Sequence, residues 1–231
     1  MILGLDTATD HLHIALVEGA KARARRLPGG PGRSASLTLL PALDALLAEA
    51  GGTRRDLTGV CVCAGPGGFT SLRIGVATAE GLALTGLPTW GFSAFALRAV
   101  ALRERGIGGA VWILLDGQRN EAFLQRWEAG AVTDAAKIPF EALKGLVGGE
   151  AWWLPESVLP KVRPYLEHDP LGLVEEGEAT CAGLMNLCRE LPKGEPEAPL
   201  HPFYLRETDA ELNFPHLSDH LSEAHRRGLA R

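Results

Sequence analysis

The sequence lacks several features that would assign a protein to a broad class directly. No apolar run is long enough to span a bilayer, which takes about 20 residues. A net charge of −5 gives no overall attraction for nucleic acid or for an anionic membrane, so any RNA contact must come from a local patch or from a partner. The apolar N-terminal stretch contains Asp6 and Asp10 and has no basic region before it. We therefore expect no signal peptide, no membrane contact and a cytoplasmic protein.

Cysteine is scarce, with four residues in the whole chain. Cys61 and Cys63 alternate along an expected strand, which puts both on one face and too close for an ordinary disulfide or a tetrahedral zinc site. Cys181 and Cys188 lie two helical turns apart. Because unpaired cysteine packs as a small hydrophobe, the sequence predicts buried free thiols in a reducing compartment.

Catalytic motifs are also scarce. The glycine-rich stretch at 65–75 lacks the Gly-Lys-Ser/Thr ending of a P-loop, and no serine lies in a G-x-S-x-G elbow. His11 and His13 alternate on an expected strand, and three more histidines lie near the C-terminus, namely His216, His220 and His225. We interpret both groups as solvated surface in preference to metal ligands.

What the sequence does contain is an α/β pattern that occurs twice. Strands are predicted at 2–7, 11–17, 20–27, 57–64 and 87–91, and helices at 34–49, 69–85 and 93–105. After the glycine-rich residues 106–110, a strand at 111–115 again ends in an aspartate turn, and a hairpin strand follows at 122–128. This repeat predicts two related lobes, 1–106 and 107–206, with the last helix of the body at 178–191. Residues 207–231 form a polar tail in which 218–227 can be helical, and we expect the tail to add little to the core.

Two turns of the first lobe could hold phosphate. Asp6 and Thr7 end the first strand, where hydroxyl and amide groups can bind phosphate and an aspartate can hold a magnesium-bound water. The stretch that contains Gly65 and Gly67 precedes a helix, whose N-terminus attracts anions. However, Ala8 places a methyl group where close approach to phosphate favours glycine. A vestigial phosphate turn and a merely capped turn both stay open.

Two polar groups each have a functional and a structural interpretation. The turn after the strand at 111–115 could meet a ligand or could be held by salt bridges through Asp116, Arg119 and Glu121. The strand at 20–27 could touch RNA phosphate, or its charges could prevent aggregation of an edge strand. Its basic residues are Lys21, Arg23, Arg25 and Arg26.

The helices at 34–49 and 69–85 have more apolar surface than one core contact requires. Two neighbouring apolar stripes cover close to half of the first helix, and the second carries a row of small residues and only two ionisable ones. A surface helix of a monomer normally has one apolar stripe and a charged face, so we predict a partner interface on both helices. Its residues are Leu40, Leu43, Leu47, Arg73, Gly75, Val76, Ala79, Leu82 and Ala83.

Four stretches make the sequence resemble the TsaB family, formerly called YeaZ. "ILGLDTAT" at 2–9 matches the family's strand and aspartate turn, and "GPGGFTSLRIG" at 65–75 follows its G-P-G-S-F-T-G-x-R-I-G pattern. "PFYLR" at 202–206 matches P-x-Y-L-R, and "DGQRNEAF" at 116–123 is a looser fit to D-A-R-x-x-E-x-Y. Gln118 replaces the usual arginine, and "WWLPESV" stands where the family often has a glycine-rich turn. These two departures argue against a ligand role for the second lobe.

The resemblance implies a two-lobed actin-like (ribonuclease H-like) α/β fold with mixed sheets flanked by helices. It also implies a non-catalytic partner of the paralogue TsaD in N6-threonylcarbamoylation of adenosine 37 in tRNA, acting with the ATPase TsaE. Such a chain needs no cofactor of its own, because ATP and threonylcarbamoyl-AMP are used by the complex. It forms homodimers when alone and meets tRNA mainly through the complex. The alternatives are an independent actin-like ATPase, phosphotransferase or metallopeptidase, and a purely structural dimer.

Overall fold

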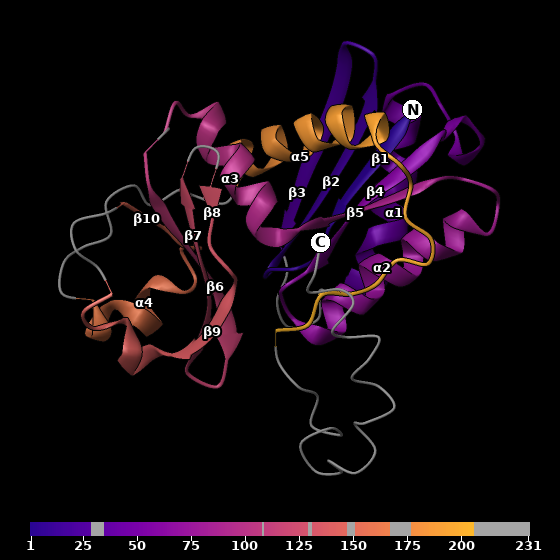
Figure 1. The fold of residues 1–231 in the computed structure, drawn as a ribbon. Coiled ribbons are helices and arrows are strands. Elements are labelled where there is room, and N and C mark those ends of the chain that lie inside the picture. Colours follow the sequence, from indigo (N-terminus) through magenta and orange to yellow (C-terminus); the bar gives the residue numbers. More distant parts are fainter. Residues whose placement is uncertain (29–34, 108, 129–130, 147–150, 167–176, 206–231) are drawn as a thin grey trace.

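A computed structural model describes residues 1–28, 35–107, 109–128, 131–146, 151–166 and 177–205 of the 231-residue chain. Two sheets, each with its own helices, form two lobes (Figure 1). The first sheet has the order β3-β2-β1-β4-β5, in which β1 is antiparallel to β2 and parallel to β4. Its strands are β1 (Ile2–Asp6), β2 (His11–Glu18), β3 (Lys21–Pro28), β4 (Gly59–Gly65) and β5 (Thr89–Ser93).

The second sheet repeats the central pairing of the first. Its strand β6 is antiparallel to β7 and parallel to β10, as β1 is to β2 and β4. The repeated pattern of strands in the sequence therefore corresponds to a repeated topology. The strands are β6 (Val111–Gln118), β7 (Glu121–Glu128), β8 (Ala131–Val132), β9 (Ala136–Pro139) and β10 (Ala151–Trp153).

Helices cover both faces of the first sheet. On one face, α1 (Ala35–Glu49) and α2 (Phe69–Ala83) pack on Leu3 and Leu5 of β1, and on the other α3 (Ala94–Glu104) packs on the side of Cys61 and Cys63. That second core continues into the second sheet, whose far face is covered by α4 (Leu159–Val162) and a turn at 140–143. This turn, Phe140–Leu143, is a short 3-10 helix, as are Arg54–Asp56, Arg163–Tyr165 and Leu191–Lys193. No helix in the described ranges is long and apolar enough to cross a membrane.

The cysteines are free thiols, as predicted. Cys61, Cys63 and Cys188 are buried, whereas Cys181 is half-buried. Burial raises the pKa of Cys63, and it raises that of Cys181 to about 11. These two thiols therefore stay protonated at neutral pH.

The last helix, α5 (Glu178–Glu190), lies on the first sheet and not on the second (Figure 1). It packs on β1, β2, β3 and α3. The sequence predicted that residues 107–206 form the second lobe, whereas this helix belongs to the first. Gly4 lets α5 lie close to β1, because a Cβ added at this glycine would lie 2.5 Å from Sγ of Cys188 on α5. The following segment runs back along the first lobe, where the amides of Glu197 and Phe203 donate to the carbonyls of Thr89 (2.7 Å) and Ala64 (2.6 Å). The C-terminal part of the described chain thus completes the first lobe.

Candidate functional site

A small cleft lies where the β1–β2 turn and the start of α2 approach the end of β6. Its volume is about 60 Å³. Pockets that bury a drug-sized ligand have volumes from about 300 Å³ upward, so this cleft is too small for a nucleotide as it stands. Its lining residues are Ala8, Thr9, Asp10, Gly67, Gly68, Ser71, Leu115, Asp116, Gln118, Pro155, Ser157 and Val158.

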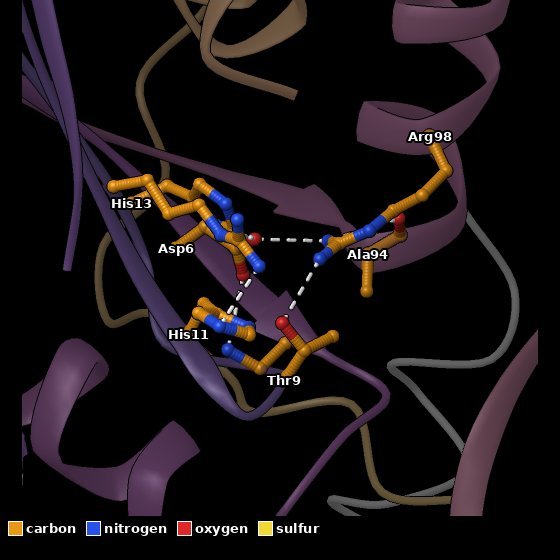
Figure 2. A network of polar contacts seen from close by, with 8 residues as sticks. Asp6, Thr9, His11, His13, Ala94 and Arg98 are labelled. Carbon is orange, nitrogen blue, oxygen red and sulfur yellow. Dashed lines mark hydrogen bonds and ion pairs between the residues drawn. The ribbon is translucent and has the colours of Figure 1, made fainter. Parts of the chain in front are cut away.

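Beside this cleft, the carboxylate of Asp6 belongs to a buried ionic cluster (Figure 2). Oδ2 of Asp6 lies 2.9 Å from Nη1 of Arg98 and 3.4 Å from Nδ1 of His13, and all three side chains are fully buried. Oδ1 accepts a hydrogen bond from the amide of Ala8 at 3.0 Å. Nη2 of Arg98 also donates to the hydroxyl of Thr9 at 3.3 Å. Both carboxylate oxygens of Asp6 therefore have partners inside the fold.

The charge of Arg98 decides the protonation state of Asp6. Burial alone would raise the pKa of Asp6, but the neighbouring guanidinium, helped by His13, lowers it well below its ordinary value. Asp6 is therefore an anion whose countercharge is a residue of α3. A carboxylate held in this way is not available to a magnesium-bound water. The sequence interpretation of His13 as solvated surface is wrong. His13 lies opposite Asp6 of β1 and its side chain is buried.

The other residues of the predicted phosphate turn, Thr7, Gly65 and Gly67, make close contacts with neighbouring backbone. A Cβ added at Gly67 would lie 2.3 Å from the carbonyl oxygen of Ala8, and one at Gly65 would lie 2.3 Å from that of Phe203. The hydroxyl of Thr7 donates to the carbonyl of Ser71 at 2.7 Å. Of the four residues that the sequence proposed for phosphate, only Gly67 lines the cleft. The glycines are thus explained by the contact between β1, α2 and the C-terminal segment.

Gly75 of α2 allows a comparison with Gly81 of the same helix. A Cβ at Gly75 would lie 2.5 Å from the Thr7 hydroxyl, whereas a Cβ at Gly81 meets nothing within 4 Å. We expect Gly75→Ala to lower the free energy of unfolding, because overpacking costs about 1–3 kcal/mol. Gly81→Ala should raise it by roughly 0.5–1 kcal/mol through helix propensity. Urea unfolding of both variants checks the prediction, and equal effects would show that α2 does not press on Thr7.

The turn after β6 and the basic strand β3 were each given a functional and a structural interpretation. Their described contacts favour the structural interpretation in both cases. Asp116 accepts from the amide of Gln118 at 2.8 Å and pairs with Lys161 at 2.6 Å, so the turn after β6 is salt-bridged. The strand β3 is the edge of its sheet. Arg25 on this strand pairs with Glu49, and Arg26 contacts His11.

The predicted partner interface is only partly exposed. Five of its nine residues face the sheet and are buried in the free chain, namely Leu43, Leu47, Gly75, Val76 and Ala79. The prediction that these five residues form a partner interface is therefore corrected, because they lie in the core. They are buried because β1 and β4 need apolar cover and because small residues let α2 approach Thr7. Leu40 and Arg73 are exposed, and Leu82 and Ala83 are half-buried.

A different set of apolar residues lies on the outside of these helices. Leu37 is 70% exposed and Leu40 41% on α1, and Phe69 and Leu84 are 38% and 90% exposed at the two ends of α2. The exposed small residues between them include Ala77. We call Leu37, Leu40, Phe69, Ala77 and Leu84 the outer strip. Sequence periodicity indicated surplus apolar surface but not which residues point outward.

The C-terminal motif at 202–206 contacts the start of the outer strip. The ring of Tyr204 lies 5.2 Å from that of Phe69, and the guanidinium of Arg73 stacks 3.7 Å above the Phe69 ring. Nε of Arg73 donates to the Tyr204 hydroxyl at 3.3 Å. Two sequence motifs that are distant in the chain therefore form one aromatic and cationic cluster.

Comparison with known proteins agrees with this geometry. The profile of a family described as "TsaD: tRNA N6-adenosine threonylcarbamoyltransferase" matches residues 27–150. The tRNA threonylcarbamoyladenosine biosynthesis protein TsaB of Escherichia coli is 26% identical, over 93% of this chain and 98% of its own. An uncharacterized protein of Mycobacterium tuberculosis is 31% identical, over 91% of this chain and 93% of its own. The chain belongs to the TsaB (YeaZ) family.

Solved structures of the TsaB family share the fold. The structure of YeaZ from Pseudomonas aeruginosa superimposes with a TM-score of 0.70 at 23% identity, covering 88% of this chain and 99% of that one. The chain therefore has the two-lobed actin-like fold that the family resemblance implied. In this TsaB-family member, the end of β1 carries a neutralised aspartate.

Proposed function

We propose that the chain is a non-catalytic partner of TsaD in N6-threonylcarbamoylation of adenosine 37 in tRNA, acting with the ATPase TsaE in the cytoplasm. The observation that carries the proposal is the outer strip, which leaves apolar side chains of two adjacent helices uncovered in the free chain. Exposed apolar patches of this kind mark protein interfaces.

The match to the TsaD family profile supports a paralogous partner. Residues 27–150 include both helices of the outer strip, so this chain and TsaD share this part of the fold. A surface that pairs with its own copy in a two-fold homodimer can pair with the same surface of a paralogue. We therefore assign the outer strip to the homodimer of the isolated chain and to the TsaD complex.

The buried cluster of Asp6 supports the non-catalytic part of the proposal. An independent actin-like ATPase, phosphotransferase or metallopeptidase needs an acidic group that is open to metal and substrate, and Asp6 is paired with Arg98 inside the fold. ATP and threonylcarbamoyl-AMP are then used by the complex, no cofactor is required by this chain, and tRNA is met mainly through the partners.

A reconstituted transfer assay tests this function. With the cognate TsaD, TsaE, ATP, threonylcarbamoyl-AMP synthesis and tRNA, modification should depend on adding this chain. The chain alone should turn over neither nucleotide nor peptide. Transfer that is equally fast without the chain would overturn the partner role. Robust turnover by the chain alone that is lost in Asp6→Ala would overturn the non-catalytic role.

A further inference from the structure

The exposed side of α2 carries two opposite charges among the apolar residues of the outer strip. Arg73 and Glu80 are both exposed. They lie on either side of Ala77, one four residues before it and the other three residues after it. With Phe69 and Leu84, these side chains fall within an arc of about 80° on a helix of 3.6 residues per turn. One face of α2 therefore presents an apolar, a basic, a small, an acidic and an apolar side chain in that order.

Neither charge has an opposite charge as its partner within the parts of the chain that the structure describes. The guanidinium of Arg73 stacks 3.7 Å above the ring of Phe69, and its Nε donates to the hydroxyl of Tyr204 at 3.3 Å. These contacts hold the side chain in place and leave Nη1 and Nη2 available to an acceptor. Arg73 and Glu80 do not pair with each other, because about 10 Å of helix rise separates residues that are seven apart.

The face is complementary to itself when a second α2 lies antiparallel to the first. A two-fold axis next to Ala77 places Arg73 of each copy opposite Glu80 of the other. The same axis places Phe69 of each copy opposite Leu84 of the other, because both pairs have the same midpoint on the helix. The small side chain of Ala77 at the axis lets the two helices approach. Reciprocal contacts of this kind are the property of a two-fold interface, in which residue i contacts j and j contacts i.

We propose that the outer strip binds a second copy of this chain with its α2 helices antiparallel, held in register by two reciprocal ion pairs between Arg73 and Glu80. The proposal rests on the proposed function for the use of the outer strip as an interface, and it adds the geometry and the residues that select the partner. The occupant is a second copy because one axis satisfies the basic, acidic and apolar positions together. A partner without matching charges would leave Arg73 and Glu80 unpaired under apolar cover, which is costly.

Charge reversal tests the ion pairs. Either Arg73→Glu or Glu80→Arg turns both attractive pairs of the homodimer into repulsive ones, so each variant should dimerise about 10- to 100-fold more weakly than the unmodified chain. An equimolar mixture of the two variants should form a heterodimer, since each supplies the charge that the other needs. Both substitutions in one chain should restore the homodimer. Sedimentation of each protein and of the mixture measures these constants.

The mixture separates pairing between copies from a change within one copy. Arg73→Glu also removes the stacking on Phe69 and the hydrogen bond to Tyr204, and a second copy with Glu80→Arg restores neither. Glu104 is exposed on α3, which covers the opposite face of the sheet, so Glu104→Arg should leave the homodimer unchanged. Circular dichroism monitors the fold of every variant. A mixture that associates no more strongly than its components would overturn the ion pairs.

Cysteine cross-linking tests the antiparallel register without changing a charge. Next to the proposed axis, the two copies of position 77 come close enough for a disulfide, which needs Cα atoms about 4.4–6.8 Å apart. The two copies of position 81 would lie about 13 Å apart along the helices. With oxidised glutathione as the oxidant, Ala77→Cys should form a covalent dimer and Gly81→Cys, also on the exposed side of α2, should not. Cross-linking of both variants would indicate parallel helices and cross-linking of neither a different contact, and either result would overturn the proposal.

This proposal and the proposed function fail in different ways. A chain that stays monomeric at every concentration overturns the antiparallel homodimer, while the transfer assay with TsaD still decides the partner role. Transfer that does not need the chain overturns the partner role, while the charge and cysteine variants still decide the homodimer. A homodimer that is lost in Ala77→Arg but not in either charge reversal keeps the outer strip as the interface and overturns the proposed register.

Discussion

Arg98→Ala is expected to destabilise the protein by about 3–5 kcal/mol, a large fraction of the roughly 5–15 kcal/mol that stabilises a typical domain. The substitution leaves Asp6 fully buried without the guanidinium 2.9 Å away that neutralises it. It also removes the hydrogen bond to Thr9 and the cation–π contact with Trp153 of the second lobe, whose ring centroid lies 5.6 Å from the guanidinium carbon. Urea unfolding followed by circular dichroism measures the loss.

The double variant Asp6→Asn with Arg98→Met separates the cost of an unpaired charge from the loss of packing. Asparagine keeps the acceptor for the Ala8 amide, and methionine fills most of the space of the arginine stem. Replacing both partners of a buried ion pair costs far less than removing one, so the double variant should be more stable than Arg98→Ala. Arg54→Ala, which breaks the exposed pair with Asp44, should leave the unfolding midpoint nearly unchanged. A mild effect of Arg98→Ala would mean that the cluster is hydrated and not a sealed ion pair.

Ala77→Arg is expected to weaken both the homodimer and the TsaD complex by about 100-fold or more while the fold survives. Ala77 is exposed on α2, so the new side chain meets water in the free chain but would be buried uncompensated under a partner. Such a charge costs about 3 kcal/mol or more, and each 1.4 kcal/mol is tenfold in affinity. Sedimentation and pull-down with TsaD measure the loss, and circular dichroism monitors the fold.

Two arginine substitutions of helical alanines control this prediction. Ala79 is fully buried on the same helix, so Ala79→Arg should unfold the protein instead of producing a folded monomer. Ala96 is exposed on α3, which covers the opposite face of the sheet, so Ala96→Arg should change neither the fold nor the association. Normal association of a folded Ala77→Arg variant would place the interface away from the outer strip.

Local signals in the sequence were sufficient for most of the secondary structure. The hairpin of β1 and β2, the Ser93 cap of α3 and the strand pair around Asp116 were predicted within a few residues, because alternation, capping and turns act over short distances. The sequence also predicts cover for α2 on more than one side; the sheet covers one side through Val76 and Ala79, and cover on the outer side stays a prediction. It did not show that the core uses Gly75 and Ala79, since helical periodicity gives the relative direction of side chains and not the position of the sheet.

The ionic cluster could not have been read from the sequence. The sequence leaves Asp6 open between a vestigial phosphate turn and a merely capped turn, whereas its partners in the structure come from α3 and β2. Arg98 and Arg103 both lie on α3, and nothing local in the sequence distinguishes the buried arginine from the one that extends to solvent. The position of α5 has the same cause, since the apolar stripe of a helix does not identify which of two sheets it covers.

The return of α5 to the first sheet has a consequence for the order in which the protein is made. About 85 residues separate the end of β5 from the start of α5, so the part of this face that α5 covers, beside α3, lacks its helix while the second lobe is synthesised. At 5–20 residues per second this delay lasts roughly 4–17 s on the ribosome. During that time Cys61, Ala15 and Val17 lack the helix that shields them in the finished protein. The first lobe is therefore a discontinuous folding unit that is completed only after α5 has emerged.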